Sequence, residues 1–82
     1  MKWESLRLRN PDCVEAKTKN IRLVVVKGHV QDPEHWLLDT NPEIFKGHYK
    51  LGCTELSIEE ACKKAEQVTK DRLKAMLHEL EE

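Results

Sequence analysis

The feature that most constrains the fold is a helical pattern of apolar residues in the C-terminal part of the chain. Apolar side chains recur there at spacings of three and four residues, which places them on one face of an α-helix. Ser57 followed by Glu60 is a capping box, which satisfies amides that are otherwise unpaired in the first turn. We therefore predict one long amphipathic helix over about residues 57–80. Its apolar positions are Ile58, Ala61, Cys62, Ala65, Val68, Leu73, Met76, Leu77 and Leu80.

Upstream of this helix the apolar residues alternate with polar ones, which is the pattern of strands with one buried face. The valine-rich segment IRLVVVKGHV is typical of a central strand because β-branched residues pack well on a pleated sheet. The turn residues Asn10-Pro11-Asp12 predict a loop over residues 10–20. We expect strands at about residues 3–9, 21–30, 35–39 and 44–53.

Together these elements predict an α+β fold in a single domain, residues 1–82. We expect an antiparallel meander of three to four strands, with one long C-terminal amphipathic helix packed on the sheet. A chain of 82 residues allows one small domain with a thin core.

Composition limits the surroundings and the partners of the chain. Its formal net charge is −1, so no bulk attraction draws it to nucleic acid or to an anionic membrane. No apolar run approaches the ~18 residues that a membrane helix needs, and the N-terminal residues lack the apolar segment of a secretory signal. We therefore expect a cytoplasmic protein that does not bind membranes. Cys13, Cys53 and Cys62 are odd in number and widely spaced, so we expect reduced thiols.

The stretch KGHVQDPEHW, residues 27–36, is the densest group of potential metal or catalytic ligands. It contains His29, Asp32, Glu34 and His35. Zinc sites use pairs of Cys or His two to four residues apart, and this chain has neither Cys-x-x-Cys nor His-x-x-x-His. We therefore interpret residues 27–36 as a loop connecting two strands, and we expect no metal and no cofactor.

Catalytic motifs are equally lacking in the sequence. No glycine-rich phosphate-binding pattern is present, and no local pattern combines a Ser or Cys nucleophile with a base. A thin core also leaves little room for a deep pocket. We therefore expect no enzymatic activity.

Two kinds of macromolecular binding remain, and the first is binding to another protein. A helix over residues 58–81 would be roughly 36 Å long, whereas a typical strand spans ~17–20 Å. The C-terminal end of the helix, which carries the large apolar residues, would then overhang the sheet and contact a partner or a second copy. Alternatively, it covers the domain's own core above Trp36 and Phe45. The candidate partner-binding residues are Leu73, Met76, Leu77 and Leu80.

The second kind is nucleic-acid binding by the N-terminal part of the chain, where basic residues outnumber acidic ones. Basic side chains on paired strands, with an aromatic ring for base stacking, are typical of a surface that binds single strands. The balance of the whole chain is slightly acidic, which favours the protein partner instead. The candidate nucleic-acid-binding residues are Trp3, Arg7, Arg9, Arg22 and Lys27.

The order of features over about residues 21–70 resembles small bacteriophage and prophage proteins. In that plan, strands with a Trp-containing hairpin precede a helix with the pattern Ser/Thr-x-Glu-Glu-Ala-x-x-x-Ala-Glu. Here the helix part of the plan is occupied by Ser57, Glu59, Glu60, Ala61, Ala65 and Glu66. The resemblance implies an accessory or regulatory protein of phage type, and it implies no catalytic residues.

Overall fold

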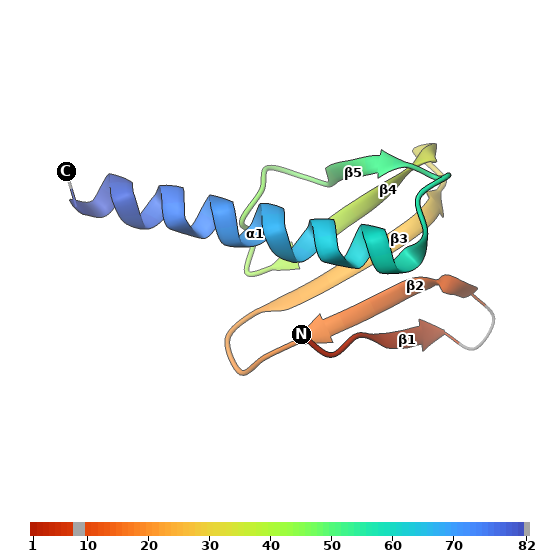
Figure 1. Cartoon of the computed structure of the whole chain (residues 1–82), viewed down its shortest axis with the longest axis horizontal. Coiled ribbons are helices and arrows are strands. Elements are labelled where there is room, and N and C mark those ends of the chain that lie inside the picture. The colour runs from red at the N-terminus through yellow and green to blue at the C-terminus, as the bar shows by residue number, and fades with distance from the viewer. Residues whose placement is uncertain (8–9, 82) are drawn as a thin grey trace.

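Five strands and one helix make up the part of the chain that the structure, a computed structural model, describes: residues 1–7 and 10–81 (Figure 1). The strands form one sheet in the order β1-β2-β3-β4-β5, and each neighbouring pair is antiparallel. Their bounds are β1 Glu4–Arg7, β2 Asn10–Lys17, β3 Arg22–His29, β4 Asp32–Asn41 and β5 Tyr49–Cys53. The helix is α1, Ile58–Glu81.

The expected α+β class, with an antiparallel sheet and a C-terminal helix, is confirmed, but the expected number of three to four strands is wrong. The additional strand is β2, which occupies most of the segment that we predicted as a loop. Val14 pairs with Val25 and Ala16 with Leu23, and all four side chains are buried. Tertiary pairing with the valine-rich β3 therefore overrides the turn chemistry at the start of the segment.

Strand lengths also differ from the prediction, because strand pairing extends some segments and excludes others. β4 runs from Asp32 to Asn41, well beyond the expected 35–39, and pairs along its length with β3. β5 covers only the second half of the expected strand 44–53. Ile44 is buried and Phe45 half-buried, but both lie outside the sheet ladder.

The hairpin between β3 and β4 is tighter than the loop predicted for residues 27–36. His29 pairs with Asp32, so only Val30 and Gln31 form the turn. The register shifts between Lys27 and His29, and Gly28 has φ 75°, a left-handed conformation that favours glycine. Pro33 lies within β4 beside this bulge. It has no backbone N–H to donate, and the register gives it no partner residue on β3.

α1 packs on one face of the sheet through small residues. Ala61 and Ala65 are 0 % exposed, and Cys62 is buried beside them. Because these side chains are short, the helix approaches the sheet closely. The sheet contributes the larger side chains of this core: Val14, Leu23, Val25, Trp36, Leu38 and Leu51.

Beyond Thr69 the helix has no sheet beneath it. Thr69 is buried, whereas every residue from 70 to 81 is exposed. Figure 1 shows the C-terminal half of α1 extending past the ends of the strands. Among the described residues, no helix is both long and apolar enough to cross a membrane.

The close contact between α1 and the sheet predicts different effects for one substitution at two sites of the helix. Ala65→Leu should lower the free energy of unfolding by about 1–3 kcal/mol, because the larger side chain has no space above the sheet. Ala75→Leu, on the exposed part of the same helix, should change it by less than about 0.5 kcal/mol. Urea denaturation of both variants measures the difference, and equal effects would contradict the packing described.

Candidate interaction surface

The exposed end of α1 carries a continuous stripe of large apolar side chains, which we call the apolar stripe. Its members are spaced three, four and seven residues apart, so they share one face of the helix. None of them belongs to the core cluster, so the alternative that they cover the core above Trp36 and Phe45 is wrong. The apolar stripe consists of Leu73 (44 % exposed), Met76 (37 %), Leu77 (57 %) and Leu80 (85 %).

A hollow lies at the base of the apolar stripe, between the helix and one end of the sheet. Its volume is about 400 Å³. Thr69 forms part of the wall, and its buried Oγ1 has no hydrogen-bond partner among the described residues. Packing between helix and sheet is therefore incomplete where the overhang begins. The lining residues are Met1, Thr18, Ile21, Leu23, Glu66, Thr69, Lys70 and Leu73.

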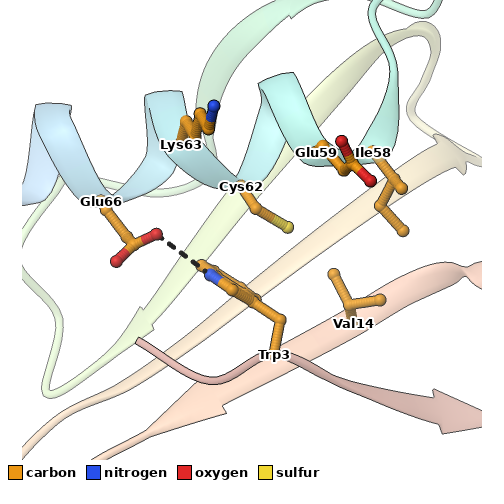
Figure 2. Close-up of a pocket in the computed structure, with 7 residues that line it drawn as sticks. All are labelled: Trp3, Val14, Ile58, Glu59, Cys62, Lys63 and Glu66. Carbon is orange, nitrogen blue, oxygen red and sulfur yellow. Dashed lines mark hydrogen bonds between the residues drawn. The ribbon is translucent and has the colours of Figure 1, made fainter.

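A second hollow, of about 410 Å³, lies beside the first half of the helix and is closed on one side by Trp3 (Figure 2). The indole Nε1 of Trp3 donates a hydrogen bond to Glu66 Oε2 at 3.3 Å, and the Met1 ammonium donates to Glu66 Oε1 at 2.8 Å. The ammonium hydrogen bond, more than the indole one, holds the pKa of the Glu66 carboxyl below its usual value. Glu66 thus ties the N-terminal segment to α1.

Cys62 also lines the second hollow, but its thiol is not suited to nucleophilic chemistry. Burial, assisted by the nearby Glu66 carboxylate, raises the pKa of Cys62 to about 11. The thiol is therefore protonated near neutral pH, whereas a reactive cysteine needs a thiolate. Cys13 and Cys53 are free thiols as well.

The histidines and carboxylates of the β3–β4 hairpin form local contacts rather than one convergent site. His35 Nδ1 lies 2.7 Å from Asp32 Oδ1, and Lys50 Nζ on β5 lies 3.3 Å from Asp32 Oδ2. His29 Nδ1 accepts a hydrogen bond from the Gln31 amide. Within residues 1–7 and 10–81, no three His, Cys, Asp or Glu side chains are grouped so that they could hold a metal ion.

Of the basic residues in the predicted nucleic-acid-binding set, Arg22 and Lys27 have described side chains, and these do not lie on one surface. Arg22 forms an ion pair with Glu15, whereas Lys27 lies over the Trp36 ring, with Nζ 5.7 Å from the ring centroid. Along β3, Arg22 and Lys27 alternate onto opposite faces, and Lys27 shares the helix-covered face with Leu23 and Val25.

The remaining members of that set are placed less favourably or lie outside the description. Trp3 is half-buried, and its indole Nε1 donates a hydrogen bond to Glu66. Arg7 is the last residue of β1, but its side chain and the whole of Arg9 lie outside the described part of the chain.

Comparisons of the chain with protein-family models, with curated proteins and with solved structures gave no match.

Sequence patterns alone indicated some parts of this surface and missed others. The apolar stripe follows from helical spacing. The hollow beneath it was missed, because it combines Ile21 and Leu23 with Thr69 and Leu73 from a distant part of the chain. Glu66 was noted only for the helix pattern. Its contacts with Met1 and Trp3, more than sixty residues away, have no local sequence signal.

The contacts of Asp32 predict a specific pH dependence of stability. The hydrogen bond from His35, and then the one from Lys50, lowers the pKa of the Asp32 carboxyl. A carboxyl with a lowered folded-state pKa stabilises the protein above its unfolded value of ~3.9. That stabilisation is lost as the pH falls through the folded value.

Asp32→Asn should therefore make the free energy of unfolding fall less steeply below about pH 4 than in the wild type. Asp39→Asn, on the same strand, is the control because Asp39 is exposed. Urea denaturation at a series of pH values provides the slopes. Identical slopes for wild type and Asp32→Asn would contradict the role given to Asp32.

Proposed function

We propose that this chain is a protein-interaction module that binds its partner through the apolar stripe. The observation that carries the proposal is that four large apolar side chains are exposed on one face of a helix end that has no sheet beneath it. Contiguous exposed apolar surface of this kind typically marks an interaction site. Covering this surface would contribute roughly 25 cal/mol to the free energy of binding for each Å² of apolar surface removed from water.

The length of the overhang supports the same conclusion. Isolated helices shorter than ~12–15 residues are marginally stable in water, and the part of α1 after Thr69 is of that length. It remains attached to a packed half that nucleates it, but its described residues, 70–81, are all exposed. A partner on the apolar stripe would cover part of them.

Binding is favoured over catalysis by the chemistry of the described side chains. The thiol beside the second hollow is held protonated, and the hairpin histidines are engaged with Asp32 and the Gln31 amide. In keeping with the resemblance of residues 21–70, we propose an accessory or regulatory role of phage type, exerted in the cytoplasm.

Site-specific photo-crosslinking tests the proposed surface. A photoreactive phenylalanine analogue is placed at Leu77, on the apolar stripe, or at Asp71, on the opposite face of the same helix. We expect crosslinks to protein from Leu77 and few from Asp71, because only the stripe face contacts the partner. Crosslinks of equal strength from both sites, or none from Leu77, would refute the proposal.

Nucleic-acid binding is the competing function, and salt dependence distinguishes it. Binding through Arg22, Lys27 and the N-terminal arginines would release counterions, so the affinity for single-stranded DNA or RNA should fall steeply with salt. We expect no measurable affinity at low salt, since Arg22 is paired with Glu15 and lies on the opposite face from Lys27. Steeply salt-dependent binding in a fluorescence anisotropy titration would favour the competing function.

A further inference from the structure

We infer that a second copy of this chain covers the apolar stripe, with the two helix ends antiparallel about a two-fold axis near Met76 and Leu77. This inference rests on the proposed function and names its partner. It follows from how the apolar and charged residues are distributed along the exposed part of α1, residues 70–81.

The apolar stripe is self-complementary when the two helices are antiparallel. A two-fold axis between Met76 and Leu77 brings Leu73 of one copy level with Leu80 of the other. Met76 then lies level with Leu77 of the second copy. Each large apolar side chain therefore meets another, as an interface between identical surfaces requires.

Charges on both flanks of the stripe complement each other in the same arrangement. On one flank, Arg72 and Glu79 are seven residues apart, so they lie on the same side of the helix. On the other flank, Lys70 and Lys74 are followed by Glu81. On each flank the basic residues come first and the acidic residue comes later.

Two-fold symmetry brings the same flank of the two antiparallel copies together with their directions reversed. Arg72 then lies beside Glu79 of the second copy, and Lys70 and Lys74 lie beside its Glu81. In a parallel two-fold pair opposite flanks would meet instead, so Arg72 would lie beside Lys70 and Lys74 of the second copy and Glu79 beside its Glu81, which is repulsive. The charges therefore select the antiparallel arrangement. They also place basic side chains near the C-terminal end of each helix, where the dipole favours them.

The two antiparallel helices meet along a line of contact that we call the seam. The hollow at the base of the apolar stripe lies close to the end of this seam. Leu73 lines the hollow, and the symmetry places Leu80 of the second copy level with Leu73. Ile21 and Leu23 provide apolar surface there. The 85 % exposed Leu80 would thus be covered at the mouth of the second copy's hollow.

The size of the seam predicts a weak dimer. A stable interface involves roughly 20–30 residues from each partner, and this seam offers only the apolar stripe and its flanking charges. We expect a monomer–dimer equilibrium with a dissociation constant in the micromolar range or somewhat weaker. Sedimentation equilibrium of the full chain, up to about 1 mM, measures it directly. A wild type that remains monomeric throughout overturns the inference.

Charge exchange within the chain tests the antiparallel register. Arg72→Glu alone places Glu beside Glu79 of the second copy on both symmetric sides, and should raise the dissociation constant about tenfold. Glu79→Arg alone should do the same. The double variant Arg72→Glu/Glu79→Arg restores both attractive contacts and should return to within about threefold of the wild type. Asp71→Lys, on the opposite face, is the control and should have little effect.

The results separate this inference from the proposed function. Failure of the double variant to rescue the dimer, or unchanged dimerisation in both single variants, overturns the antiparallel seam. Leu77→Asp/Leu80→Asp should give a folded monomer that still unfolds cooperatively in urea, because these residues lie outside the core. Crosslinks from Leu77 only to other proteins would sustain the proposed function while refuting self-association. Crosslinks to no protein refute both.

Discussion

The structure depends on the close approach of two alanines to the sheet. Ala61 and Ala65 are completely buried against larger side chains such as Leu38 and Leu51. Because the helix lies so close, its position along the sheet is fixed at its N-terminal half. The Trp36 indole reinforces that position by donating a hydrogen bond to the Leu56 carbonyl at 3.0 Å, just before the helix begins. A helix anchored at its start and longer than the sheet must then leave its other end uncovered.

How much of the fold the sequence predicted depended on whether the signal was local. The capping box is confirmed, since the Glu60 amide donates to Ser57 Oγ and the Ser57 amide to Glu60 Oε1. The valine-rich strand is likewise found as β3. β2 was missed because its apolar residues are few and follow turn chemistry, so only pairing with β3 defines it.

The candidate surface shows the same division. Helical spacing and a comparison of helix and strand lengths indicated an overhang of Leu73 and its neighbours, but left open the alternative that they cover the core. By contrast, Arg22 and Lys27 were grouped by charge, although residues five apart on a strand lie on opposite faces. The alternation of side chains along a strand would by itself have placed Arg22 and Lys27 on opposite faces of the sheet. The partners that occupy Trp3 and Arg22, namely Glu66 and Glu15, required the folded structure.

The contact of Glu66 with the N-terminal segment has a consequence for the order in which the chain assembles. Every strand pairs with its neighbour in sequence, so the sheet can form by successive local hairpins, a topology that favours rapid folding. The bonds from Met1 and Trp3 to Glu66 instead close loops of more than sixty residues. They can form only after α1 has docked. For β1, at one edge of the sheet, we therefore expect the last restraint to form late in folding and to be released early in native-state fluctuations.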